Sequence, residues 1–98
     1  MTASLRLRPE ARADIREAAR WYENEQPGLG DLFVSRVLAL LERIAQSPQH
    51  FPYLRSPVRR ALVAQFPYGV YFTHQDGRTV VLAVTHQRRD PAIWKNRL

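Results

Sequence analysis

The stretch Thr79–Pro91, TVVLAVTHQRRDP, decides the fold of this chain. Its first part, Val80–Val84, is an unbroken apolar run, rich in β-branched residues and too short for a typical helix. Such a run predicts a strand that is buried on both faces and therefore lies inside a sheet. The dipeptide Asp76-Gly77 precedes it and predicts a tight hairpin turn, because these residue types accept positive φ.

The same stretch ends in cationic and imidazole side chains. His86, Arg88 and Arg89 follow the buried run closely, and Asp90 and Pro91 come directly after them. A rigid strand that ends by presenting these groups is where we expect a functional site. Two plainer interpretations stay open: a hydrogen bond from His86 to a backbone carbonyl, which we favour over an acid–base role, and a local ion pair between Arg89 and Asp90.

Helical patterns dominate the first half of the chain. Ser4–Arg8 alternates Leu with Arg and predicts a short strand near a sheet edge. Glu10–Glu25 predicts a helix with a thin, Ala-rich apolar stripe. After the break at Gln26–Gly30, Leu32–Gln46 predicts a second helix with a wide apolar arc, which Asp31 can cap. The short connection favours an antiparallel helical hairpin.

Strand patterns dominate the second half. His50–Pro57 predicts a loop because of its prolines, and the alternation over Val58–Phe66 and then Val70–His74 predicts two strands before the buried run. The order is therefore β-α-α-β-β-β, with the last three strands antiparallel. We expect one α+β domain over residues 1–98, with the helices packed on one face of the sheet. Trp94 is expected to pin the C-terminal residues to this body.

The charge of the chain is unevenly placed. The formal net charge is +6, with seven Arg against seven acidic residues up to Gln49, and eight Lys or Arg against two acids from His50 onward. This asymmetry indicates a polyanionic partner, either nucleic acid or an acidic protein. A generally Arg-rich composition, with fourteen Arg and one Lys, explains it equally well.

Several classes of function lack their motifs. The chain has no phosphate loop, dinucleotide fingerprint or HExxH motif, and no cysteine. Its three histidines, His50, His74 and His86, do not have metal-ligand spacing. No apolar run approaches the ~20 residues of a membrane span, and the N-terminus lacks the apolar region of a signal peptide. We therefore expect a cytoplasmic protein that binds no metal and no cofactor.

Two motifs carry a resemblance to a known family. FPYGVYF (Phe66–Phe72) and HQRRDPAIW (His86–Trp94), together with the predicted order of elements, resemble the ParE branch of the RelE/ParE toxins. The resemblance covers nearly the whole chain, including PEARADIREAARWY (Pro9–Tyr22). It implies a growth-arresting toxin of a type II toxin–antitoxin module, of the kind often labelled plasmid stabilisation proteins. The implied partner is a cognate acidic antitoxin, and toxin and antitoxin would form a hetero-oligomer.

The resemblance implies DNA gyrase as the target for the ParE branch and ribosome-bound mRNA for the RelE branch. Metal-independent RNA cleavage needs an acid–base group and cations around the phosphate, for which this chain offers Arg60 (or Arg59), His86 and Arg89. The C-terminal tyrosine of RelE-type enzymes is missing. We therefore assign no catalytic residue and favour a gyrase inhibitor that acts by binding. An mRNA endoribonuclease is the alternative, and a basic nucleic-acid-binding module is the second alternative.

Candidate contact residues fall into two groups. The candidates for contact with the target are His86, Arg88, Arg89 and Trp94. The candidates for contact with the antitoxin lie on the two helices and are Arg12, Arg16, Arg20, Leu38 and Leu41. An amphipathic, acidic antitoxin segment could cover the spare leucines with its apolar side while its carboxylates meet the arginines.

Overall fold

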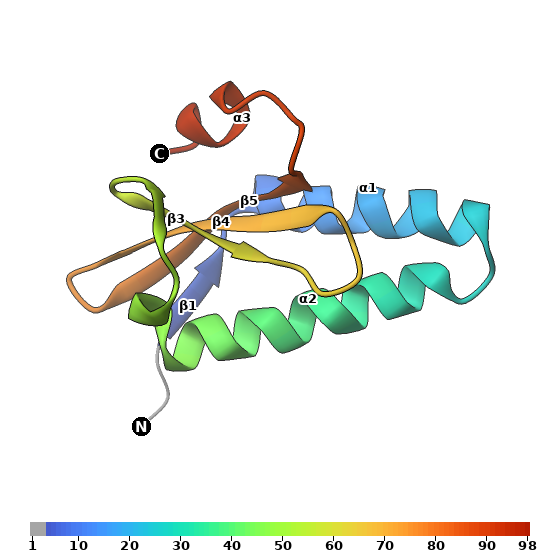
Figure 1. Cartoon of the computed structure of the whole chain (residues 1–98), viewed down its shortest axis with the longest axis horizontal. Coiled ribbons are helices and arrows are strands. Elements are labelled where there is room, and N and C mark those ends of the chain that lie inside the picture. Colours follow the sequence, from blue (N-terminus) through green and yellow to red (C-terminus); the bar gives the residue numbers. More distant parts are fainter. Residues whose placement is uncertain (1–3) are drawn as a thin grey trace.

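A computed structural model describes residues 4–98 of the chain as a helical hairpin on one face of a five-stranded sheet (Figure 1). The elements are β1 (Ser4–Leu7), α1 (Pro9–Glu25), α2 (Leu29–Gln46), the 3-10 turn η1 (Pro48–His50), β2 (Tyr53–Arg55), β3 (Val58–Leu62), β4 (Tyr68–Gln75), β5 (Arg78–His86) and α3 (Ala92–Lys95). The strand order is β1-β5-β4-β3-β2, with β1 parallel to β5 and all other pairs antiparallel. The predicted α+β fold is confirmed.

The strand β5 is buried on both faces, as its apolar run predicts. Val81 and Val84 pack into the core beneath the helices, whereas Leu82 and Ala83 pack into a second core on the opposite face. A bulge in the pairing with β4 leaves Leu82 as an extra residue, which is why two successive side chains share one face. The turn at Asp76-Gly77 has φ values of 53° and 74°, as predicted for a tight hairpin.

The start of α2 differs from the prediction. The helix begins at Leu29 rather than Leu32, and its N-cap is Gly28, in the left-handed region with a φ of 91°. Asp31 lies inside the first turn and does not cap the helix. The carboxylate of Glu23 takes this role from α1, accepting hydrogen bonds from the N–H of Gly28 at 2.9 Å and of Gly30 at 3.0 Å. The first helix therefore supplies the cap of the second.

Gly30 allows the two helices to approach closely. A Cβ atom at this position would lie 2.5 Å from the backbone oxygen of Ala19. Gly30→Ala is therefore expected to lower the free energy of unfolding by about 1–3 kcal/mol, because the helices must separate to make room. Ser35→Ala, an exposed change on the same helix, is the control and should cost less than about 0.5 kcal/mol. Urea unfolding measures both; equal stabilities would contradict the close approach.

A short edge strand lies where the sequence predicted a loop. Tyr53–Arg55 pairs with β3 within the segment His50–Pro57, so that prediction is wrong for these three residues. Pro52 and Pro57 flank the strand rather than interrupt it, and an edge strand needs hydrogen bonds on one side only. β3 in turn ends at Leu62, four residues before the predicted end.

A second, smaller core covers the face of the sheet that the helices leave free. It consists of Val58, Tyr71, Leu82, Ala83 and Trp94. Trp94 of α3 is 5% exposed and stacks on Tyr71, with ring centroids 5.9 Å apart and an interplanar angle of 10°. The prediction that Trp94 pins the C-terminal residues to the body is confirmed. Within residues 4–98, no helix has the length and apolarity needed to cross a membrane.

Candidate functional site

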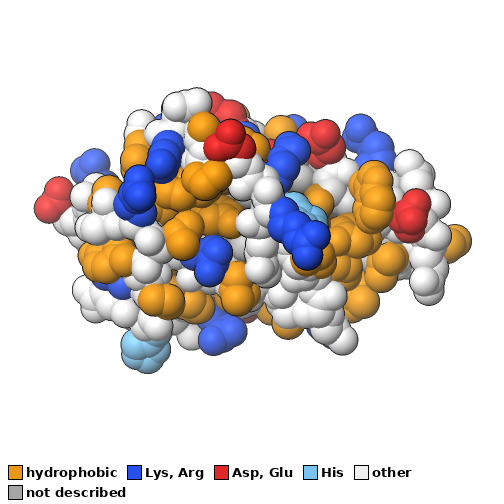
Figure 2. All heavy atoms as spheres, turned by 45° about the horizontal axis from the view of Figure 1, so that its top comes forward, with side chains coloured by type: hydrophobic (Ala, Val, Ile, Leu, Met, Phe, Trp, Pro, Cys, Tyr) orange, Lys and Arg blue, Asp and Glu red, His pale blue; other side chains and the backbone are white. Residues whose placement is uncertain are grey.

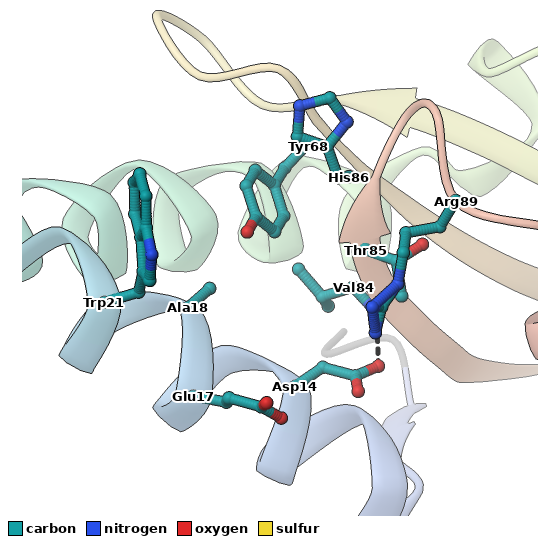
Figure 3. Close-up of a pocket in the computed structure, with 9 residues that line it drawn as sticks. All are labelled: Asp14, Glu17, Ala18, Trp21, Tyr68, Val84, Thr85, His86 and Arg89. Carbon is teal, nitrogen blue, oxygen red and sulfur yellow. Dashed lines mark hydrogen bonds between the residues drawn. The ribbon is translucent and has the colours of Figure 1, made fainter.

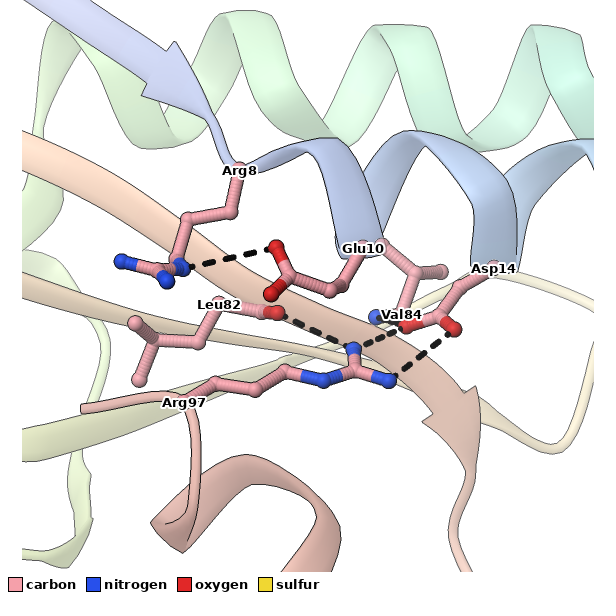
Figure 4. Close-up of polar contacts among 6 residues, drawn as sticks. All are labelled: Arg8, Glu10, Asp14, Leu82, Val84 and Arg97. Carbon is pink, nitrogen blue, oxygen red and sulfur yellow. Dashed lines mark hydrogen bonds and ion pairs between the residues drawn. The ribbon is translucent and has the colours of Figure 1, made fainter.

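The outer edge of β5 is open at its C-terminal end. β1 ends level with Val81, so no strand among residues 4–98 pairs with the rest of β5 on that side. Side chains take its place (Figure 4). Asp14 Oδ2 accepts the backbone N–H of Val84 at 3.0 Å, and Arg97 donates both to Asp14 Oδ2 at 2.6 Å and to the carbonyl oxygen of Leu82 at 3.1 Å. The C-terminal segment is thus tied to α1 and to the edge of the sheet.

A pocket of about 160 Å³ lies between this edge and α1 (Figure 3). Its lining residues are Asp14, Glu17, Ala18, Trp21, Tyr68, Val84, Thr85, His86 and Arg89. The four residues from α1 form one stripe of the helix, because their spacing is i, i+3, i+4 and i+7. The sequence predicts His86 and Arg89 as site residues but gives no prediction for this stripe. Its clearest signal was Trp21, a large aromatic residue that remains 57% exposed.

His86 is held by a local hydrogen bond at the mouth of the pocket. Its Nδ1 accepts the backbone N–H of Arg88 at 3.1 Å, so the ring acts as acceptor and not, as expected, as donor to a carbonyl. The neutral ring that makes this bond carries its proton on Nε2. The ring of Tyr68 meets His86 edge-to-face, with centroids 5.6 Å apart.

Tyr68 is kept in its neutral form. Burial raises the pKa of Tyr68 above the ordinary phenol value, the nearby charge of Arg89 opposes this rise, and the carboxylates of Glu17 and Asp14 add to it. Around pH 7 the side chain is therefore a phenol that can donate a hydrogen bond. It does not offer a phenolate base.

The three ribonuclease candidates do not share one face. Arg60 lies two residues after Val58, whose side chain belongs to the second core, so both point away from the helices. His86 and Arg89 line the pocket against α1, on the other side of the sheet. The structure therefore brings His86 and Arg89 together and leaves Arg60 apart.

Arg88 and Arg89 are both exposed in the turn after β5. Asp90 Oδ1 accepts the backbone N–H of Ala92 at 2.9 Å, and no ion pair joins Arg89 to Asp90 in the part of the chain that the structure describes. The interpretation of Arg89 and Asp90 as a local ion pair is therefore wrong. Trp94, the remaining candidate for contact with the target, lies in the second core.

The candidates for contact with the antitoxin separate into exposed and buried residues. Arg12, Arg16 and Arg20 are exposed along one side of α1, and we call them the arginine stripe. Leu38 is 57% exposed, whereas Leu41 is 7% exposed and belongs to the main core. The proposal of Leu41 as a spare surface residue is wrong, because its position on the helix places it on the sheet-facing side.

Metal binding has no visible basis in the described residues. Residues 4–98 contain no group of three or more His, Asp or Glu side chains that could hold a metal ion. What the geometry offers is a small pocket with one imidazole, one phenol and charges of both signs. Arg88 is exposed in the turn that contributes Arg89 to this pocket, and the arginine stripe is exposed on another side of α1.

This arrangement of a helical hairpin on a sheet is shared with toxin–antitoxin complexes. The chromosomal ParDE system from P. aeruginosa matches with a TM-score of 0.76 and 17% identity, covering 85% of this chain and 94% of the other. The RelBE2 complex from Mycobacterium tuberculosis matches with a TM-score of 0.62 and 17% identity, covering 89% of this chain and 100% of the other. These matches show that the chain shares the α+β fold of these structures.

Its family follows from the sequence. The model of the ParE toxin of type II toxin–antitoxin systems, parDE, matches residues 5–91. No functionally curated protein matches the chain. The chain belongs to the ParE toxin family, and the resemblance stated from its motifs is confirmed.

Proposed function

We propose that this ParE-family chain arrests growth by binding DNA gyrase, and that an acidic antitoxin segment neutralises it by covering the helical hairpin. Family membership and the toxin–antitoxin complexes that share the fold support an antitoxin partner. Gyrase and the antitoxin would both meet the chain in the cytoplasm. The observation that carries the antitoxin site is the exposed outer side of the hairpin.

The outer side of the hairpin combines one exposed leucine with the arginine stripe. The approach of Gly30 to Ala19 fixes the register of the antiparallel helices. Leu38 follows Gly30 by eight residues, so it lies about level with Arg12, which precedes Ala19 by seven. The arginine stripe lies on the side of α1 adjacent to Ala19, because successive residues turn by ~100° around a helix. We call Leu38 and the arginine stripe the hairpin face.

The hairpin face fits an amphipathic, acidic segment. The apolar side of such a segment would cover Leu38, and its carboxylates would meet the guanidinium groups, for which Arg is well suited. Burial of one leucine side chain contributes about 1.5–3 kcal/mol before the cost of ordering the segment. We therefore expect the free toxin to self-associate and the antitoxin to suppress this.

Contact with the target is proposed for the turn after β5. His86, Arg88 and Arg89 lie there; both arginines are exposed and His86 is partly buried. The pocket stripe of α1 and the arginine stripe lie about 150° apart around the helix, so the two proposed surfaces are separate. Trp94 would support this turn from within the second core rather than contact gyrase. Inhibition by binding agrees with the separation of Arg60 from His86 and with a neutral Tyr68.

An mRNA endoribonuclease is the second candidate. One observation favours it: His86 and Arg89 line a single pocket, so an imidazole and a phosphate-binding cation are available together. Neither a second cation at the pocket nor a C-terminal tyrosine accompanies them among the described residues. The basic nucleic-acid-binding module remains as a third function class.

Induction of the toxin in cells distinguishes the two main candidates. We expect loss of negative plasmid supercoiling and DNA damage, measured on chloroquine gels and by a damage-response reporter, without cleavage of mRNA at translating ribosomes. Because no proton transfer is required, His86→Gln should weaken growth arrest only to the extent that it removes one contact with the target. Codon-specific cuts in primer extension that His86→Gln abolishes would establish the endoribonuclease instead.

A further inference from the structure

The helical layer and the remainder of the chain carry opposite net charges. Residues 9–46, which form α1 and α2, contain five Arg and seven acidic residues, a net charge of −2. The other residues contain nine Arg and one Lys against two acids, a net charge of +8. The whole positive excess of the molecule therefore belongs to the sheet and the segments that follow its strands.

Part of this charge points away from the helices. In β1, Leu5 and Leu7 pack against the main core, so Arg6 between them points to the opposite side. In β5, Val80 packs against the second core, and Arg78, two residues earlier, shares its side. The side of the sheet that faces away from α1 and α2 thus carries cations on two neighbouring strands.

Two further cations extend this surface. Arg60 of β3 follows Val58 on the same side, and Lys95 of α3 is next to Trp94, which covers the second core. Figure 2 shows Lys and Arg side chains spread among apolar ones on the side of the molecule turned to the viewer. We call Arg6, Arg60, Arg78 and Lys95 the outer sheet face.

In the described part of the chain, no ion pair joins a cation of the outer sheet face to an acidic side chain. Within residues 4–98 the ion pairs are Arg8 with Glu10 and Arg97 with Asp14, and none involves this face. The two acids outside the helical layer are Asp76 in the β4–β5 turn and Asp90, which accepts a hydrogen bond from the start of α3. An excess of charge of one sign on one side of a domain attracts a polyanion.

We propose that the outer sheet face binds the phosphate backbone of duplex DNA. Single-stranded nucleic acid is usually held by exposed aromatic rings that stack on bases, but Tyr71 and Trp94 on this side are buried against each other. Guanidinium groups bind phosphates through paired hydrogen bonds and need no base contact. The strands of Arg6 and Arg60 are three spacings apart, about 14 Å, comparable with the ~12 Å major groove between two phosphate strands.

This inference goes beyond the proposed function, because DNA binding by the free chain needs neither the antitoxin nor gyrase. It also separates the surfaces of the molecule by chemistry: the hairpin face binds an acidic peptide and the outer sheet face binds DNA. An acidic protein on the outer sheet face is the competing occupant, and the experiment includes it.

The experiment measures binding of the full chain to a fluorescent duplex of about 25 bp by anisotropy, between about 50 and 200 mM salt. The test variant combines Arg6→Glu with Arg78→Glu, and the matched control combines Arg16→Glu with Arg20→Glu. Both pairs change the net charge equally, and all four residues are exposed. The test pair is expected to weaken binding by at least about tenfold and to reduce the salt slope by about 2, whereas the control pair should cost less than about threefold.

Equal losses of DNA affinity in the test pair and the control pair would overturn the proposal, because net charge alone would then explain the binding. So would a salt-independent affinity, or tighter binding of the corresponding single strand. Binding of polyglutamate as tight as that of DNA, with the same loss in the test pair, would assign the face to an acidic protein. If the test pair lowers the melting temperature, the neutral pair Arg6→Gln with Arg78→Gln replaces it in the experiment. We then expect a smaller loss of affinity for DNA.

Discussion

Reversal of Arg16 and Arg20 to Glu is expected to weaken binding of the cognate antitoxin by about 2–3 kcal/mol, or roughly 30- to 150-fold in Kd. Each reversal removes an attraction between a guanidinium and a carboxylate and replaces it by a repulsion. The affinity should also depend less on salt, because fewer opposite charges meet. Calorimetric titration with the antitoxin encoded beside this chain measures both effects.

The sheet-face pair, Arg6→Glu with Arg78→Glu, is the matched control and should change antitoxin affinity by less than about threefold. Wild-type toxin saturated with antitoxin at about 1,000 times Kd gains about 4 kcal/mol, which should raise its melting temperature by more than about 15 °C. If the reversal of Arg16 and Arg20 leaves the antitoxin affinity unchanged, the antitoxin binds another surface of the toxin. The open edge of β5 is then the next surface to test.

Trp94→Ala is expected to lower the free energy of unfolding by about 3–5 kcal/mol, because it empties the centre of the second core. Trp94 is almost fully buried against Tyr71 and holds α3 on the sheet. Any loss of toxicity in this variant should therefore accompany a loss of folded protein. Urea unfolding together with the level of soluble toxin measures the effect.

Trp21→Ala is the control, because it removes the same side chain from a position that is 57% exposed. Its expected cost is below about 1 kcal/mol. A Trp94→Ala variant that keeps full stability but loses toxicity would contradict the structural role of Trp94. Trp94 would then be assigned to the residues that contact the target.

The elements that the sequence predicts well are those specified by local patterns. The apolar run of β5, the Asp76-Gly77 turn and the bodies of both helices depend on periodicity and turn chemistry that a short window contains. The start of α2 was missed because the carboxylate that accepts its first N–H groups belongs to Glu23 of another helix. β2 was missed because three exposed residues between prolines carry no periodic signal.

The site was predicted only in part for a similar reason. The strand that ends at His86 indicated where to look, and His86 and Arg89 do line the pocket. The other wall of the pocket comes from α1 and includes Asp14 and Trp21. These residues are far from β5 in the sequence and come close to it only when the chain folds. Leu41 was misplaced because a wide apolar arc does not reveal which edge of it faces the sheet.

Inhibition of purified gyrase tests the central claim most directly. Relaxed plasmid, gyrase and ATP are combined with folded toxin, with the toxin–antitoxin complex, or with Arg89→Ala. We predict that the toxin blocks supercoiling, that equimolar antitoxin restores it, and that Arg89→Ala inhibits at least about tenfold more weakly at an unchanged melting temperature. Full supercoiling activity in the presence of saturating toxin that is folded and binds its antitoxin would contradict the account.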